Sequence, residues 1–402
     1  MKDLVAVAIC LLLCITSMQA QDITQSQDIG QSQTKNPPSK VQFAYGVNFD
    51  FDFDNREFDA GKERFTESMT LFGARLTPSI GINVRQNKSV SHKIMLGIDV
   101  MKEFGNRPVN IGSGPESDNK LENTKLFREI TLYYGLNAII GDCQIEGYAG
   151  MFPRRFSEGS YTKAFFSDSL LFYDNNLEGM LIKMRSSKSF IEAAADWRGK
   201  YGDFRREEFV LFGHGYYQFT KWFKVGFTMQ YHHYANTSRY GSVVDNGLVH
   251  PFACFEFEKF TGMQELSLKL GWYQGLQQDR RLDFGTSTPS GAEAELGIRK
   301  WNVGIRNTLY FGEDLMPFYN STDAEGFKYG NNVYYGSPFY RVHASGNTGQ
   351  WGMYNKMEIY YEPYIADFMN IRIGAIFHFP EGFRFGGTQQ KVSISFNLDK
   401  IL

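Results

Sequence analysis

The sequence predicts an all-β protein, an antiparallel transmembrane β-barrel of about sixteen strands, on the basis of three observations. Apolar and polar residues alternate strictly in many segments, the connections between segments are alternately short and long, and no apolar run beyond the N-terminal region could form a spanning helix. In one segment, Phe223, Val225 and Phe227 alternate with Lys224 and Thr228. A period of two places the two sets on opposite faces of a strand. Because one face carries charge, we expect an oily outside around a water-filled inside.

The N-terminal region has the features of an export signal, which we place at residues 1–20. Lys2 precedes an apolar run, and the small residue Ala20 stands before the expected cleavage point. Residues 21–40 are rich in glutamine and serine and are expected to form a disordered leader. The barrel is then expected over residues 41–402, in the cell outer membrane.

Sixteen segments have the length and alternation of strands. They lie at about 41–52, 69–84, 91–104, 125–138, 142–152, 177–186, 189–198, 207–219, 222–234, 250–258, 263–273, 291–299, 301–311, 352–362, 367–379 and 390–398. The connections between them alternate regularly between short and long, as in barrels with short periplasmic turns and long extracellular loops.

Composition agrees with a membrane barrel and excludes one class of partner. Mean hydropathy is −0.36, as expected when only alternate residues face lipid. The formal net charge of −2 argues against a nucleic-acid partner. We therefore expect the lipid bilayer of the outer membrane and small hydrophilic solutes as partners.

The inward faces carry many charged side chains, which are tolerable only where water or an opposite charge meets them. Sixteen strands leave room for an aqueous channel, whose wall charges can select permeants. The alternative is that most of them are solvated and have no individual role. The predicted pore-wall residues are Lys183, Arg185, Asp196, Arg198, Lys224, Arg299, Arg306 and Arg372.

The third long loop, at about 153–176, holds more aromatic residues than an exposed loop usually does. Folding inward against the barrel wall would bury them. Here the chain resembles the sixteen-stranded trimeric porins of Gram-negative outer membranes, including anion- and substrate-selective types. The resemblance implies that this loop narrows the channel and that the protein forms a homotrimer. It also implies a constriction in which Arg154, Arg155 and Lys163 face Asp168 or Asp174.

The function expected from this pattern is that of a porin, which lets small hydrophilic solutes diffuse through the lumen. The alternative is a barrel component of a nutrient-uptake or secretion complex, which binds a ligand or a partner protein. The tyrosine-rich loop at 312–351 keeps this alternative open, since exposed tyrosines suit carbohydrate or protein contacts.

An enzyme is the third hypothesis. Outer-membrane lipases and deacylases use a serine and a histidine with an acid or amide helper, placed on the outer wall near the membrane surface. His232 and His233 end one predicted strand near Asn236 and Ser238, but adjacent residues point to opposite faces. Since no nucleophile stands at a diagnostic spacing, we expect no enzyme activity, no catalytic residues and no cofactor.

The sequence also contains two candidate metal sites and one candidate disulfide. Calcium at the Asp50–Asp54 run lacks the glycine and late glutamate of a calcium loop. A site built from His232, His250 and Asp245 is a further alternative, but no metal is expected. Whether Cys143 and Cys254 form a disulfide stays open.

Overall fold

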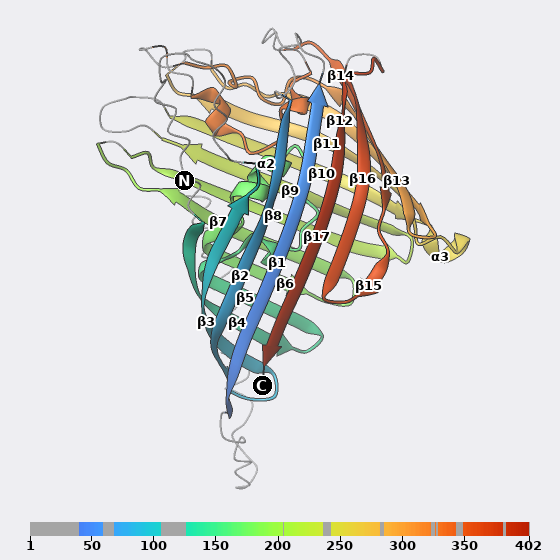
Figure 1. Ribbon diagram of the computed structural model, residues 1–402. Helices are drawn as coiled ribbons and strands as arrows, with labels where there is room; N and C mark the ends of the chain where they lie inside the picture. Colours follow the sequence, from blue (N-terminus) through green and yellow to red (C-terminus); the bar gives the residue numbers. More distant parts are fainter. Residues whose placement is uncertain are drawn as a thin grey trace, which may run out of the picture. The chain divides into compact units, whose positions relative to one another are not determined.

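The computed structural model describes residues 40–58, 68–105, 126–203, 205–235, 243–281, 285–322, 326, 329–342, 349–380 and 383–401. These residues form one β-barrel (Figure 1). Its strands are β1 (Lys40–Phe58), β2 (Met69–Arg85), β3 (Val90–Glu103), β4 (Phe127–Ile140), β5 (Cys143–Pro153), β6 (Asn176–Arg185), β7 (Ser189–Gly199), β8 (Glu208–Thr220), β9 (Phe223–Tyr234), β10 (Val244–Glu256), β11 (Glu265–Asp279), β12 (Ser290–Lys300), β13 (Val303–Gly312), β14 (Gly352–Tyr361), β15 (Tyr364–Ala366), β16 (Met369–Pro380) and β17 (Gly387–Ile401). The helical elements are η1 (Arg154–Phe156), α2 (Asp168–Tyr173), α3 (Glu258–Thr261), η2 (Gly330–Val333) and η3 (Pro338–Tyr340).

The barrel is closed, because β1 pairs antiparallel with both β2 and β17. The short strand β15 pairs only with β16, and β14 pairs directly with β16, so sixteen longer strands complete the wall. Short and long connections alternate along the chain as predicted. This architecture confirms the predicted fold class and, at the level of the fold, the resemblance to sixteen-stranded porins.

Several strands run further toward the long loops than predicted. β1 continues to Phe58, β10 begins at Val244 and β11 continues to Asp279. In each case the alternation persists, as in β10, where Val244 and Asn246 are buried in the lumen beside the exposed position Val249. At the long-loop end the strands therefore extend further beyond the apolar, lipid-facing band than predicted.

Pro78 lies inside β2, where the sequence shows an interruption, yet β2 is continuous from Met69 to Arg85. Pro78 faces Val47 on the β1 side, and the ladder to β3 skips from Leu76 to Ser79. Since proline has no N–H to donate, the strand accommodates it at a position where the β3 ladder is interrupted.

The outward faces are apolar along the strands. Phe43, Leu270 and Ile373, on the apolar faces of their strands, have exposed fractions of 49%, 44% and 49%. Trp197 and Trp301, at strand ends, are also exposed, where an aromatic girdle would lie. In the described parts of the chain, no helix is both long and apolar enough to cross a membrane.

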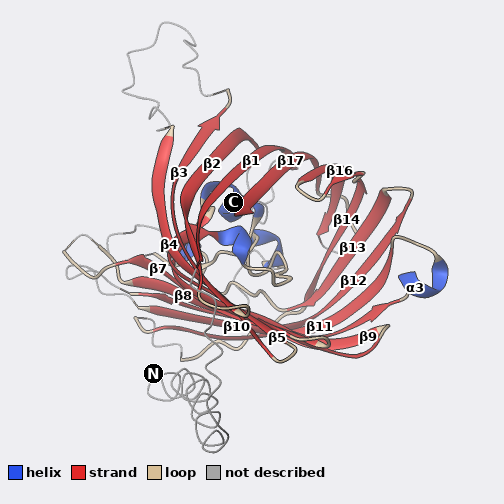
Figure 2. Ribbon diagram, turned by 90° about the horizontal axis from the view of Figure 1, so that it is seen from below, coloured by secondary structure: helices blue, strands red, loops and turns tan. Residues whose placement is uncertain are grey.

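Two segments fill much of the barrel lumen (Figure 2). We call residues 154–175 the first lumenal segment and the described part of 313–342 the second. Phe165 of the first segment is fully buried beside Tyr273 of β11, and Tyr340 of the second is 2% exposed. The two segments also bond to each other, since the Ser167 N–H donates to the Tyr335 carbonyl at 2.7 Å.

The expected signal peptide lies outside the described residues, as does all of the expected leader except Lys40, which begins β1. Cys143 and Cys254 are both described, and both are free thiols.

Candidate functional site

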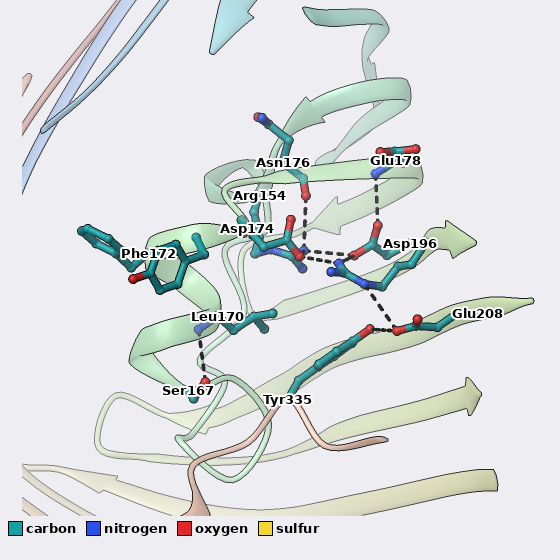
Figure 3. Close-up of polar contacts among 12 residues, drawn as sticks. Arg154, Ser167, Leu170, Phe172, Asp174, Asn176, Glu178, Asp196, Glu208 and Tyr335 are labelled. Atoms are coloured by element: carbon teal, nitrogen blue, oxygen red, sulfur yellow. Dashed lines mark hydrogen bonds and ion pairs between the residues drawn. The ribbon is translucent and has the colours of Figure 1, made fainter. Parts of the chain in front are cut away.

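The predicted constriction residue Arg154 lies at the start of the first lumenal segment and is 7% exposed (Figure 3). Its guanidinium pairs with Asp174 at 2.9 Å and with Asp196 of β7 at 3.0 Å. Arg198 pairs with the same two carboxylates and lies 4.9 Å from the ring centre of Tyr335. This network ties the segment to the wall, so Arg154 is not a free charge facing open water.

Lys163 and Asp168, also predicted for the constriction, pair with each other at 2.6 Å. Lys391 of β17 reaches the same carboxylate at 3.0 Å. Burial alone would raise the pKa of Asp168, but the two lysines hold that pKa well below its ordinary value. Burial lowers the pKa of Lys163. The fifth predicted residue, Arg155, lies 3.7 Å from Asp399 of β17.

The remaining predicted wall residues also have carboxylate partners. Lys183 pairs with Glu146 and Glu158, Arg185 with Glu158, Lys224 with Glu256, Arg299 with Glu362, Arg306 with Glu265, and Arg372 with Glu358 and Glu362. The charges of the predicted pore-wall residues are thus largely neutralised by ion pairs with neighbouring carboxylates.

We expected the tyrosines of the long loop at 312–351 to be exposed, but several of them are buried inside the barrel. Tyr329 and Tyr340 are 3% and 2% exposed, and the Tyr335 hydroxyl donates to Glu208 of β8. The aromatic content of this loop could have predicted its inward path, because it is about as high as that of the loop at 153–176.

A polar cluster that the sequence analysis missed lies on the outer wall, at the long-loop end of β9, β10 and β11. We call Tyr231, His233, Asp245 and Arg280 the outer-wall cluster. The Asp245 carboxylate accepts hydrogen bonds from His233 Nδ1 at 2.7 Å, from the Tyr231 hydroxyl at 2.7 Å and from Arg280 Nη2 at 2.6 Å. His233 stacks on Phe209, with ring centres 5.0 Å apart.

The alternation of β9 explains why this cluster faces outward. His232 points into the lumen, where its ring nitrogens meet Glu208 and the Val333 carbonyl, so its neighbour His233 points out. With Nδ1–H donated to Asp245, the second nitrogen, Nε2, is left as a proton acceptor. Among the residues described, His233 Nε2 has no hydrogen-bond partner. An oriented imidazole beside a carboxylate is the arrangement of a general base.

An apolar hollow of about 830 Å³ lies further down the same strands. Pro251 and Ala253 of β10 lie between Phe227 of β9 and Trp272 of β11, and Gly215 of β8 stands opposite Phe227 on its other side. Phe227 is six residues before His233, which corresponds to about 20 Å along the strand. The hollow thus lies on the lipid side of the wall below the cluster.

The metal alternatives do not assemble in the described residues, where no three histidine, cysteine, aspartate or glutamate side chains form a metal cluster. Asp245 faces outward while His232 and His250 are fully buried in the lumen. His250 stacks on Tyr273, with ring centres 4.1 Å apart. Asn236 and Ser238, which the sequence analysis placed near His233, lie outside the described residues.

The chain is similar to several solved outer-membrane proteins. A loop L8 deletion mutant of OmpT of Vibrio cholerae has 9% identity and a TM-score of 0.49 over 90% of this chain and 100% of its own. The anion-selective porin from Comamonas acidovorans has 9% identity and a TM-score of 0.43 over 90% and 100%. OmpF of Salmonella typhi in complex with daunomycin has 10% identity and a TM-score of 0.44 over 90% and 98%. The barrel assignment rests on the strand pairing of the chain itself.

No curated protein matches the chain. Residues 38–349 match the family described as Lipid A 3'-O-deacylase-type. The match covers β1 to β13, both lumenal segments and the whole outer-wall cluster. The prediction that the chain is not an enzyme is therefore wrong, because the protein belongs to the Lipid A 3'-O-deacylase-type family.

Proposed function

We propose that the protein is an outer-membrane hydrolase that removes an ester-linked acyl chain from a lipid A-type glycolipid. The observation that carries the proposal is the outward-facing pair of His233 and Asp245, with 2.7 Å between Nδ1 and Oδ1. Both residues lie at the long-loop end of the wall, where the head groups of the outer leaflet meet water. The family description supports the reaction class and the 3′ position of the ester.

The chemistry is ester hydrolysis by general-base catalysis. His233 Nε2 takes a proton from a water molecule as the water oxygen attacks the acyl carbonyl carbon. The tetrahedral intermediate then breaks the bond between this carbon and the sugar oxygen, and the imidazolium returns the proton to that oxygen. The products are a free fatty acid and a sugar hydroxyl. Asp245 is a positioning residue that fixes the ring and stabilises its protonated form.

Two further features suit a glycolipid substrate. Arg280 is held by Asp245 while 56% of its side chain is exposed, so it can pair with a phosphate group of the head group. The apolar hollow at Gly215 and Pro251 offers room for an acyl chain on the membrane side of the wall.

The test is a deacylation assay with the full chain in mixed micelles containing lipid A, in which the released fatty acid is measured by mass spectrometry. His233→Ala is expected to lower kcat/KM by about 10²-fold or more, the range for loss of a general base. Asp245→Asn is expected to act mainly on kcat. His232→Gln, one residue away on the lumenal face, is the matched control and should retain activity.

Two results would decide against the proposal. Wild-type protein that releases no fatty acid from lipid A would end the proposed reaction. A folded His233→Ala variant with full activity would remove His233 from the site while leaving the reaction in place. Ser238→Ala tests a serine nucleophile, because a loss of activity in this variant would replace direct attack by water with an acyl-enzyme route.

Diffusion of small hydrophilic solutes through the lumen is the second candidate function, as a property beside the enzymatic one. The observation that favours it is the water-accessible space of about 440 Å³ left inside the barrel. Planar-bilayer conductance tests it, and deletion of residues 156–172 should raise the conductance. An absence of stepwise conductance in the wild-type protein and in the deletion variant would contradict diffusion through the lumen.

Three further proposals are a homotrimer, delivery by a signal peptide and a ligand-binding role in an uptake complex. Cross-linking and mass spectrometry can address them.

A further inference from the structure

The space inside the barrel is a chamber of about 440 Å³ bounded by β11 to β14, β16, β17, β1 and the two lumenal segments. It reaches toward the short-turn end, because Lys269, Arg306 and Arg372 each lie within the first five residues of their strands. The lumenal segments bound the other side, where Tyr340 and Phe339 line it. We call this space the lumenal chamber.

Cations outnumber anions in its lining. Lysine and arginine contribute seven of the lining residues, and aspartate and glutamate contribute three. Asp168 is shared by two lysines, at 2.6 Å from Lys163 and 3.0 Å from Lys391. The lining arginines have acidic partners, such as Asp54 beside Arg56 at 2.8 Å.

Two lysines of the chamber, Lys269 and Lys356, have no ion-pair partner among the described residues. Within the described ranges, no carboxylate lies within the 4.0 Å of an ion pair from the Nζ of Lys269 or of Lys356. Glu295 stands opposite Lys269 in the register of β11 and β12, but it lies near Arg306 at 3.8 Å. Lys269 lies 4.3 Å from the ring centre of Phe252 and interacts with the carboxylate of Glu293 only beyond ion-pair distance. A partly buried cation without a direct ion-pair partner favours the binding of an anion.

The two lysines lie on β11 and β14, which are separated by β12 and β13. Three strand spacings place their backbones roughly 14 Å apart around the wall. A solute with two charged groups can place one group at each Nζ, whereas a single small anion would have to draw both side chains together.

The rest of the lining is built to hold such a solute in place. Tyr354 donates to His378 Nδ1 at 2.8 Å, and Gln389, bonded to His378 Nε2 at 2.9 Å, donates in turn to Asp54. Asp54 fixes Arg56, which donates to Ser169 at 3.0 Å. This chain of bonds fixes the side chains of one wall, which lowers the entropic cost of binding.

We propose that the lumenal chamber binds a small solute that carries two phosphate groups, with Lys269 and Lys356 as its main cationic contacts. Lysine acts as a point charge toward phosphate, and the arginines and hydroxyl groups of the lining supply further donors. The site is separate from the outer-wall cluster and does not depend on the deacylase proposal.

The test is calorimetric titration of the full chain in detergent with pyrophosphate and with a hexose bisphosphate. Wild-type protein should bind one of the two, more weakly at high salt. The double variant Lys269→Gln and Lys356→Gln should weaken binding at least tenfold. Lys224→Gln, a lumenal lysine outside the chamber that pairs with Glu256, is the matched control and should leave the affinity unchanged.

Other outcomes overturn the proposal. Absence of binding by folded wild-type protein would overturn it, as would equal binding by the double variant or an equal loss in Lys224→Gln. Tighter binding of citrate than of either phosphate probe would overturn the ligand class. The deacylation assay on the same double variant separates the two proposals, because full deacylation with lost pyrophosphate binding supports the chamber alone.

Discussion

At the scale of single residues, one buried carboxylate anchors the first lumenal segment to the wall. Glu192 of β7 is 2% exposed and accepts hydrogen bonds from the Ser157 hydroxyl, the backbone N–H groups of Glu158 and Gly159, and the Tyr161 hydroxyl, at 2.6 to 2.8 Å. Four donors around one carboxylate leave little freedom to the loop that follows η1. The inward position of Glu192 follows from the alternation of β7, but its four donors come from a loop whose path the alternation does not determine.

Replacement of this carboxylate by an amide tests the anchor. Glu192→Gln should lower the free energy of unfolding by about 2 kcal/mol, since the amide nitrogen would face donors and leave buried groups unpaired. Denaturant unfolding in detergent measures the difference. Glu178→Gln, at an exposed position two residues into the neighbouring strand β6, is the control and should change little. Equal stability of Glu192→Gln and wild type would contradict the anchoring role.

The ion pairs of Asp168 predict that the free energy of unfolding depends on pH. Its pKa is held well below the ordinary value by Lys163 and Lys391, so the unfolded chain takes up the proton at a higher pH than the folded protein. The stabilising contribution is therefore present above about pH 4 and is lost as the pH falls further. Asp168→Asn should cost stability at about pH 6 and less at about pH 3. A cost that is the same at both pH values, measured by denaturant unfolding, would contradict this.

At the scale of elements, the two lumenal segments act as one insert. The Ser337 N–H donates to the Lys163 carbonyl at 2.7 Å, and a Cβ added at Gly336 would collide with the carbonyl oxygen of Ala164. Glycine is needed here because two backbones meet with no space for a side chain.

Gly336→Ala should therefore push the segments apart. We expect faster limited proteolysis within residues 154–175 and 313–342 than in wild type, with the strands still protected. Gly147→Ala in β5 is the control, because a Cβ there would meet only Leu136 at an ordinary 3.8 Å. Proteolysis unchanged in Gly336→Ala would show that the segments do not depend on this contact.

At the scale of the whole molecule, the barrel could be predicted from the sequence because alternation is a local signal repeated along every strand. Leu270 and Lys269 are neighbours in sequence and, as alternation requires, Leu270 lies on the outer face and Lys269 in the lumen. The contents of the lumen could be predicted only in part, because contacts such as that of Tyr335 with Glu208 join residues more than a hundred positions apart. The outer-wall cluster was missed for a similar reason, since His233 and Asp245 meet only through the register of β9 and β10.

The closed sheet predicts how the protein migrates in gel electrophoresis before and after boiling. Folded protein in detergent should resist unfolding at room temperature and migrate faster than the same sample after boiling, because the hydrogen-bonded wall has no free edge. A single migration rate under both conditions, together with solubility without detergent, would contradict the barrel.

The seam between β1 and β17 also constrains how the protein can be made. The pairs from Ala44 with Ile401 to Phe58 with Gly387 join the two ends of the sheet. β1 is synthesised before β17, and until β17 is made one edge of β1 is unpaired and prone to join another chain. A chain that ends before residue 387 would leave this edge of β1 unpaired, and we expect such a product to aggregate.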